Sequence, residues 1–139
     1  EKTSPVFVQS FEASSLRYLR PRTSVRLVQL TDRAAEITPE KLEEIATYAD
    51  GIGVEKKLII PVDENGTAQA PTSLVRDAHA AKLFVHVWTL RREAQFLPAS
   101  YHGDLAAEVR QFVDAGVDGL FTDFPDVAAG VIKGNRTGK

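Results

Sequence analysis

Hydrophobic residues are spaced in two ways along the chain, and segments with one spacing are followed by segments with the other. Segments with apolar residues three and four positions apart predict helices. Short runs rich in β-branched and aromatic residues separate these segments and predict strands. There are five such runs: Val6–Ser10, Val25–Leu30, Gly51–Val54, Leu83–Trp88 and Gly119–Thr122. A regular exchange of strands and helices predicts an α/β fold with a parallel sheet built from about five βα units.

The predicted helices begin at capping residues and carry one apolar face. Thr38 before Pro39 predicts one helix start, because the hydroxyl accepts a backbone hydrogen bond and proline fits the first turn. The clearest apolar stripe follows Asp104 and predicts a helix over Leu105–Ala115. Its apolar residues are expected to pack on the sheet: Leu105, Val109, Phe112 and Val113. Its polar residues are expected to face water: Glu108, Arg110, Gln111 and Asp114.

The end of the chain is more polar than the rest. Asp126 predicts the start of a short last helix that ends near Ile132. We therefore expect one domain over residues 1–132, followed by a polar, frayed tail over residues 133–139.

The length of 139 residues is compatible with two architectures. A barrel of eight βα units takes about 250 residues, so the chain would hold a little more than half of one. A complete doubly wound sheet of five strands is also a natural length for this chain. The two differ in strand order, which is consecutive in a barrel and reverses at a switch point in a doubly wound sheet. The pattern alone leaves both open.

Composition narrows the classes of function. Lys and Arg number 17 against 19 Asp and Glu, which argues against a nucleic-acid partner because such proteins carry a basic excess. No apolar run approaches the roughly 20 residues of a membrane span. The chain has no cysteine, which excludes disulfides and thiolate chemistry. It also has no methionine, so we interpret it as a processed chain or a piece of a longer one.

Four segments together resemble a known family. They are, in order along the chain, Pro5–Phe11, Tyr48–Gly53, His86–Arg91 and Gly116–Asp126. The residues in these segments and the spacing between them resemble the C-terminal half of a glycerophosphodiester phosphodiesterase of the bacterial periplasmic type. The resemblance runs from Pro5 to about Ile132. It implies the fourth to eighth strands of a TIM (β/α)8 barrel, and it favours this partial barrel over the doubly wound sheet.

Other motifs of that family do not occur in this sequence: His-Arg-Gly, Pro-Glu-Asn-Thr, Glu-x-Asp and His-Asp. The resemblance implies that these would carry the catalytic histidines and the metal-binding carboxylates. It also implies a reaction in which a divalent ion, Mg or Ca, assists hydrolysis of a glycerophosphodiester to glycerol 3-phosphate and an alcohol. We expect these groups in the complete enzyme only. The chain alone is expected to hold no catalytic residue and no metal, and to be inactive.

Five residues are the candidates for substrate binding, because a barrel has its working face at the C-terminal ends of its strands. Trp88 is expected to form an apolar wall for a glycerol or alcohol group, or else to be a core residue. Phe11 is expected to shape the same pocket, and Gln9 or Ser10 to hydrogen-bond the substrate or a metal ligand. Arg91 is a candidate for binding phosphate oxygens, with a plain salt bridge as the alternative.

Several titratable residues have structural interpretations. Alternation along a strand puts His86 on the same face as Trp88, but deeper, where a structural role is more typical. Asp123 is interpreted as an anchor for the barrel seam. Asp50 and Asp118 each precede a glycine and are interpreted as turn residues at strand starts.

The expected partners follow from the open sheet. A partial barrel exposes edge strands and an apolar face, so we expect either the N-terminal half of the barrel or another copy of the chain to cover them. A glycerophosphodiester is the expected substrate of the complete enzyme. The alternative is a non-catalytic half-barrel that binds a ligand or supports another chain.

A receiver-like signalling domain is a further class with five βα units. It would need an acidic pair at the positions that Gln9 and Ser10 occupy, so the sequence disfavours it. The expected location is periplasmic or secreted, with the cytoplasm left open.

Overall fold

Strands and helices alternate along the whole of residues 3–136, the part of the chain that a computed structural model describes. The strands form one sheet in the order β1-β2-β3-β4-β5, and each neighbouring pair is parallel. The strands are β1 (Phe7–Ser10), β2 (Arg26–Thr31), β3 (Gly51–Glu55), β4 (Phe84–Leu90) and β5 (Gly119–Thr122). This consecutive order confirms the segment of a barrel and rules out a doubly wound sheet, in which the order reverses.

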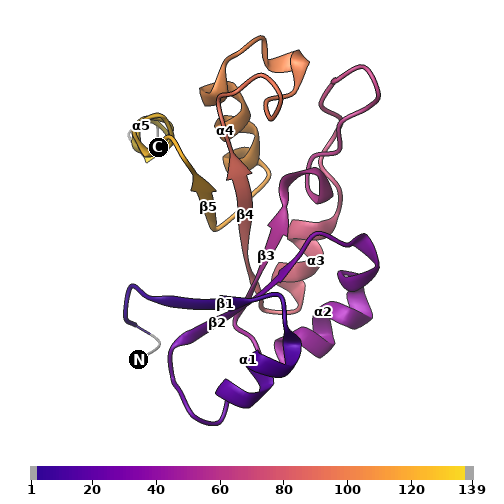
Figure 1. Cartoon of the computed structure of the whole chain (residues 1–139), viewed down its shortest axis with the longest axis vertical. Coiled ribbons are helices and arrows are strands. Elements are labelled where there is room, and N and C mark those ends of the chain that lie inside the picture. Colours follow the sequence, from indigo (N-terminus) through magenta and orange to yellow (C-terminus); the bar gives the residue numbers. More distant parts are fainter. Residues whose placement is uncertain (1–2, 137–139) are drawn as a thin grey trace.

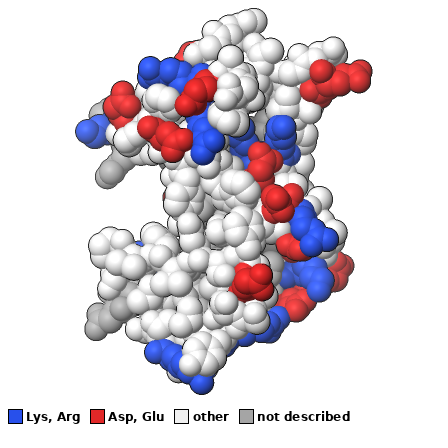
Figure 2. All heavy atoms as spheres, viewed as in Figure 1, with Lys and Arg blue, Asp and Glu red and all other residues white. Residues whose placement is uncertain are grey.

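The helices cover the outer face of the sheet and leave the other face open (Figure 1). The α-helices are α1 (Ala13–Leu19), α2 (Pro39–Ala46), α3 (Leu74–Ala80), α4 (Leu105–Asp114) and α5 (Pro125–Arg136). Within the described residues, three short 3-10 helices lie in the connections: η1 (Ala34–Glu36), η2 (Lys56–Leu58) and η3 (Ala99–Tyr101). Figure 2 shows the open side as a hollow that contains few charged side chains. Most of the charged side chains in this view lie around the hollow. No helix within the described residues has the length and apolar character needed to cross a membrane.

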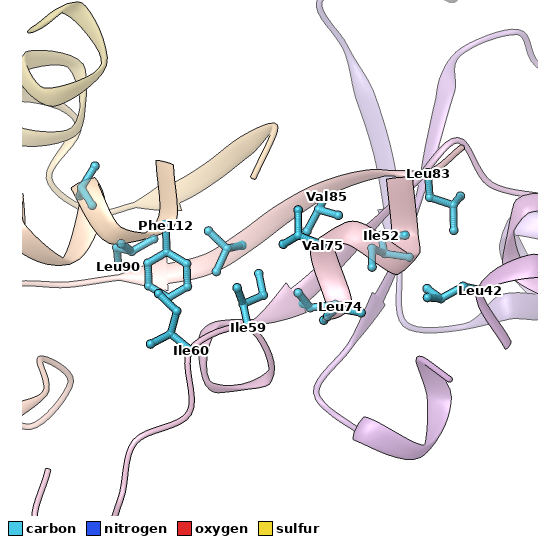
Figure 3. Packing of buried hydrophobic residues seen from close by; sticks show 14 of the residues in the cluster. Leu42, Ile52, Ile59, Ile60, Leu74, Val75, Leu83, Val85, Leu90 and Phe112 are labelled. Carbon is cyan, nitrogen blue, oxygen red and sulfur yellow. The ribbon is translucent and has the colours of Figure 1, made fainter. Parts of the chain in front are cut away.

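The core lies between the sheet and the helices. Val85 and Val87 of β4 are completely buried there, as the alternation along the strand predicts. Figure 3 shows Val85 beside Val75 of α3, and Leu90 beside Phe112 of α4. α3 and α4 thus place apolar side chains on the outer face of the sheet (Figure 3), and α5 packs against α4. The inner face keeps the remaining side chains of the strands.

Aromatic rings gather on the inner face. The His86 ring lies 4.9 Å from that of Phe7, 4.8 Å from that of Phe84 and 5.9 Å from that of Phe121, measured between centroids. A side chain at position 119 would place its Cβ 2.7 Å from the His86 ring, so Gly119 leaves the space that this ring occupies. Phe7 and Phe121 keep more than a third of their surface exposed. The inner face is therefore apolar and only partly covered.

Two aspartates tie neighbouring strands together at their starting ends. The Leu27 N–H of β2 donates to Asp50 Oδ2 at 2.9 Å, and the Arg20 guanidinium donates to the same oxygen at 2.7 Å. The Val85 N–H of β4 donates to Asp118 Oδ2 at 2.8 Å. Both residues precede a strand, as predicted, but each also fixes the register of the adjacent strand. This second role is not visible in the sequence pattern.

The stripe of α4 is confirmed with two corrections. Asp104 caps the helix by accepting from the Ala107 N–H, and Leu105, Val109 and Phe112 are buried. Glu108, which was expected to face water, is only 1% exposed, while Val113 is only partly buried. The reason is that the buried Lys56 ammonium faces Glu108 and provides the partner that lets its carboxylate stay inside.

The last helix corrects the expected tail. α5 continues past Ile132 to Arg136, so residues 133–136 are helical rather than frayed. Ala128 and Val131 are buried, and this packing anchors the helix, so Gly130 and Gly134 do not end it. Residues 137–139 of the expected tail lie outside the described residues.

We predict that Asp50→Ala lowers the free energy of unfolding by about 1–3 kcal/mol, because it leaves the Leu27 N–H and the Arg20 guanidinium without this acceptor. Urea denaturation monitored by circular dichroism measures the change. The matched control is Glu43→Ala, which removes an exposed carboxylate from α2 and should change stability by no more than about 0.5 kcal/mol. Equal effects of the two substitutions would contradict the role of Asp50.

Candidate functional site

A cavity of about 390 Å³ opens on the inner side of the sheet at the C-terminal ends of its strands. Its wall combines residues that follow or end β1, β4 and β5. Four predicted site residues line it: Gln9, Phe11, Trp88 and Arg91. This is the place where parallel α/β folds present their ligand-binding groups.

Trp88 and Phe11 form the apolar part of this first cavity. Their ring centroids are 5.9 Å apart and the planes meet at 80°, an edge-to-face contact between the ends of β4 and β1. Leu30 and Phe121 extend the apolar surface. The indole Nε1 of Trp88 is buried and has no hydrogen-bond partner among the described residues. The wall therefore offers flat apolar rings, while the indole donor itself is buried.

Ser10 lies apart from the other candidates. It is not among the cavity-lining residues, because alternation turns Gln9 and Phe11 toward the cavity and Ser10 away from it. Its hydroxyl instead accepts from the Glu12 N–H at 3.0 Å and so begins the turn into α1. The geometry assigns Ser10 a local structural contact.

Arg91 makes an ion pair at the edge of the cavity. Its Nε lies 2.7 Å from Asp123 Oδ2, without the alignment of a hydrogen bond. Its guanidinium also lies 4.8 Å from the centroid of the Phe96 ring. Arg91 follows β4 and Asp123 follows β5, so the pair joins the C-terminal ends of two adjacent strands. Both side chains remain more than a third exposed, although Arg91 Nε itself is buried.

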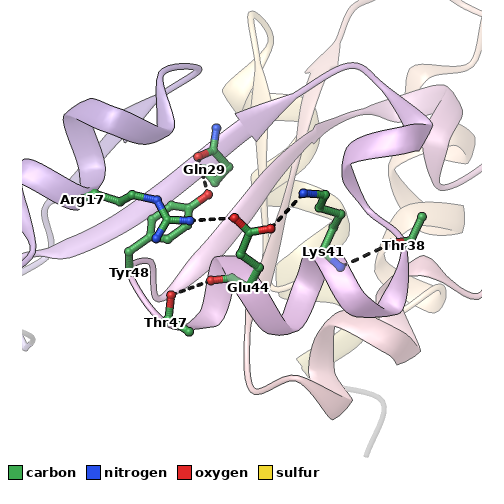
Figure 4. Close-up of polar contacts among 7 residues, drawn as sticks. All are labelled: Arg17, Gln29, Thr38, Lys41, Glu44, Thr47 and Tyr48. Carbon is green, nitrogen blue, oxygen red and sulfur yellow. Dashed lines mark hydrogen bonds and ion pairs between the residues drawn. The ribbon is translucent and has the colours of Figure 1, made fainter.

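Gln29 is a site residue that the sequence reasoning missed. It is 5% exposed in the middle of β2 and its Nε2 donates to the Phe11 carbonyl at 3.0 Å and to the Ser10 carbonyl at 3.3 Å. Its Oε1 accepts from the Tyr48 hydroxyl at 3.0 Å (Figure 4). Gln29 therefore fixes the turn that carries Phe11. The available signal was a single amide within the otherwise apolar run Leu27–Leu30.

The surroundings of Tyr48 keep its hydroxyl a donor. Burial raises the pKa of Tyr48, so the phenol stays protonated at neutral pH. The Arg17 guanidinium lies 4.1 Å from the centroid of the Tyr48 ring and donates to Glu44 at 2.8 Å, and Lys41 donates to the other Glu44 oxygen at 2.9 Å (Figure 4). These contacts join α1 to α2 behind Gln29.

His86 lies deeper on the inner face than Trp88. Burial lowers the pKa of His86, with Asp118 opposing and Arg26 adding to the effect. A neutral imidazole is therefore favoured at neutral pH, which suits its packing among aromatic rings.

A second cavity of about 260 Å³ adjoins the first. Trp88, Thr89 and Arg91 line both, so these residues separate the two spaces. The far wall comes from Lys56 at the end of β3 and from Phe96 in the connection after β4.

The side chains present do not fit a divalent metal. Within residues 3–136, no group of three or more His, Asp or Glu residues lies close enough together to bind an ion. Asp123, the acidic residue that lines the first cavity, is already paired with Arg91.

The sequence profile of the Glycerophosphoryl diester phosphodiesterase family matches residues 1–127. The chain belongs to this family. Among curated relatives, glycerophosphodiester phosphodiesterase GDPD6 of Arabidopsis thaliana is 40% identical over 133 residues, which cover 86% of this chain and 36% of that protein. The glycerophosphodiester phosphodiesterase of Haemophilus influenzae is 26% identical, with 96% of this chain and 44% of that protein covered.

Solved structures show the same fold. A structure of a putative glycerophosphoryl diester phosphodiesterase from Silicibacter pomeroyi matches 94% of this chain and 38% of that one, with a TM-score of 0.63 and 17% identity. One from Agrobacterium tumefaciens has a TM-score of 0.62 and 21% identity, with 93% and 44% covered. The chain thus spans less than half the length of these relatives and solved structures.

We predict that Gln29→Leu lowers the free energy of unfolding by about 1–3 kcal/mol, because the Tyr48 hydroxyl and the Phe11 carbonyl lose their partner. Loosening of Phe11 should also change the fluorescence of Trp88, which is the one tryptophan of the sequence and touches the Phe11 ring. The matched control is Gln69→Leu, an exposed glutamine in the connection between η2 and α3, which should leave both readouts unchanged. An unaltered emission spectrum in Gln29→Leu would contradict the link to Phe11.

Proposed function

We propose that this chain forms the substrate-binding part of a barrel that hydrolyses glycerophosphodiesters to glycerol 3-phosphate and an alcohol. Membership of the family supports the reaction class. The observation that carries the proposal for this chain is the first cavity, because it brings Trp88 and Arg91, at the end of β4, together with Phe11, at the end of β1, on one wall. Apolar rings and a guanidinium are the groups that the carbon skeleton and the phosphate of such a substrate require.

Each wall residue has a distinct part in this proposal. The Trp88 and Phe11 rings receive the carbon atoms of the glycerol or alcohol group and exclude water from them. Arg91 binds phosphate oxygens and shifts part of its interaction from Asp123 to the substrate. Gln9 adds a polar contact at the rim.

Proton transfer and metal binding are assigned to another part of the barrel. The side chains of residues 3–136 do not fit a metal, so its ligands and the general acid and base would come from the N-terminal half. We infer that this chain corresponds to the C-terminal half, the fourth to eighth strands. A periplasmic or secreted location, and a closer relation to the bacterial periplasmic type, stay predictions.

Strand number favours the N-terminal half over a second copy as the partner. A barrel of this class has eight strands, and residues 3–136 of this chain supply five, so three are needed to close it. A second copy would bring five. The exposed rings of Phe7 and Phe121 on the inner face are the surface that the closing part would cover.

We predict that the purified chain releases no glycerol 3-phosphate from glycerophosphocholine above a buffer control, with or without added Mg or Ca. A fusion of the chain to the N-terminal part of the Arabidopsis relative should hydrolyse it, because that part supplies the missing groups. Release is measured with a coupled glycerol 3-phosphate assay. Metal-dependent turnover by the chain alone would contradict the division of roles, and a folded but inactive fusion would favour the non-catalytic half-barrel.

We predict that Trp88→Ala in the active fusion lowers kcat/KM by roughly 10- to 100-fold, which corresponds to about 1.5–3 kcal/mol of lost contact with the substrate. The control is Tyr18→Ala, which removes an aromatic ring that is 62% exposed on α1 and should leave kcat/KM unchanged. Unchanged kinetics in Trp88→Ala, together with a lower melting temperature, would show that Trp88 is a core residue only.

A further inference from the structure

Lys56 connects three segments of the chain from a buried position. It directly follows β3, is 6% exposed, and its ammonium donates to Glu108 Oε1 on α4 at 2.7 Å. The same ammonium donates to the backbone carbonyl of Phe96. Phe96 lies in the connection between β4 and η3, which we call the rim loop and define as residues 91–98.

Stability alone does not account for this ion pair. Burying two charges costs free energy, and replacing such a pair with apolar residues of similar size is often neutral or stabilising. The arrangement here is also incomplete, since Glu108 Oε2 is buried without a hydrogen-bond partner among the described residues. Burial raises the pKa of Glu108, although Lys56 opposes the effect. An apolar pair would fill the same space but would offer no donor to the Phe96 carbonyl.

The rim loop links the Lys56 contact to the first cavity, because it carries both Phe96 and Arg91. The Phe96 ring lies 4.8 Å from the Arg91 guanidinium, and Arg91 is paired with Asp123. Lys56, Phe96 and Arg91 also line the second cavity together. The position of the Phe96 backbone therefore sets where the Phe96 ring supports Arg91 between the two cavities.

We propose that Lys56 and Glu108 are positioning residues, which hold the rim loop by the Phe96 carbonyl so that Arg91 stays in place at the candidate site. Their relevance for catalysis rests on the proposed function, but the positioning itself does not. Neither residue touches the reacting atoms in this scheme. Glu108 orients the ammonium by accepting its hydrogen bond, and Lys56 bonds the loop.

The test is the double variant Lys56→Met with Glu108→Leu, studied by amide hydrogen exchange of the chain. The Phe96 and Leu97 amides both donate to the Glu93 carbonyl within the rim loop, so their exchange reports on its opening. We expect the double variant to unfold at the same urea concentration as the native chain or a higher one. We expect exchange at Phe96 and Leu97 to be roughly tenfold faster, because the loop has lost its buried bond.

Two further variants make the result specific. Lys57→Met removes a neighbouring lysine whose side chain is exposed, and should leave exchange in the rim loop unchanged. Lys56→Arg keeps a buried cation with several donors, and should restore slow exchange. Unchanged exchange in a folded double variant would overturn the proposal, and so would faster exchange spread evenly over the whole chain.

A replacement test is available if the double variant does not fold. Glu108→Gln keeps the shape and one acceptor but removes the charge that holds the ammonium, so exchange at Phe96 and Leu97 should rise relative to Lys57→Met. No difference between these two variants would overturn the proposal. Because exchange requires no turnover, the outcome is independent of whether the fusion hydrolyses a phosphodiester. In an active fusion, the double variant should raise KM more than it lowers kcat.

Discussion

The two-residue alternation of parallel strands is the constraint on which the rest of this structure depends. Val85 and Val87 face the helices and are completely buried, so His86 and Trp88 must face the other way. The helices lie on that one face and cover it with apolar side chains (Figure 1). The inner face is therefore left with partly exposed aromatic rings. The first cavity forms where that face reaches the C-terminal ends of the strands.

Buried polar residues then determine where the loops at those ends lie. Gln29 fixes the turn after β1 through the Phe11 carbonyl, and Lys56 fixes the rim loop through the Phe96 carbonyl. Both act on backbone oxygens, so they set loop position without limiting which side chains the loops carry. At the opposite ends of the strands, Asp50 and Asp118 fix register. The contacts that fix register thus lie at one end of the sheet and the candidate cavity lies at the other.

The sequence was informative wherever local spacing decides the structure. The strands, the capping of α2 by Thr38, and the stripe through Leu105, Val109 and Phe112 all follow from periodicity and capping chemistry. Gln9, Phe11, Trp88 and Arg91 could be placed at one cavity because parallel strands end at the same edge.

What could not be predicted depends on contacts between distant segments. Glu108 has the position of a solvent-facing residue on its helix, and only Lys56, which is 52 residues away, keeps it inside. Gln29 has no local signal that its amide would meet Phe11. The length of α5 was missed because burial of Val131 is a property of the assembled fold, whereas Gly130 and Gly134 are visible in the sequence.

The shortness of the two outer strands has a consequence for how the sheet is extended. β1 and β5 have four residues each and one neighbour each, so each offers only a few main-chain groups to a further strand. Ladder hydrogen bonds at such edges contribute little net free energy, and they select no particular sequence. Attachment of any further strands must therefore draw its strength from desolvating the rings of the inner face. Further strands at β1 or β5 would therefore be recognised by their shape and apolar area, and the edge hydrogen bonds would only set the alignment of the strands.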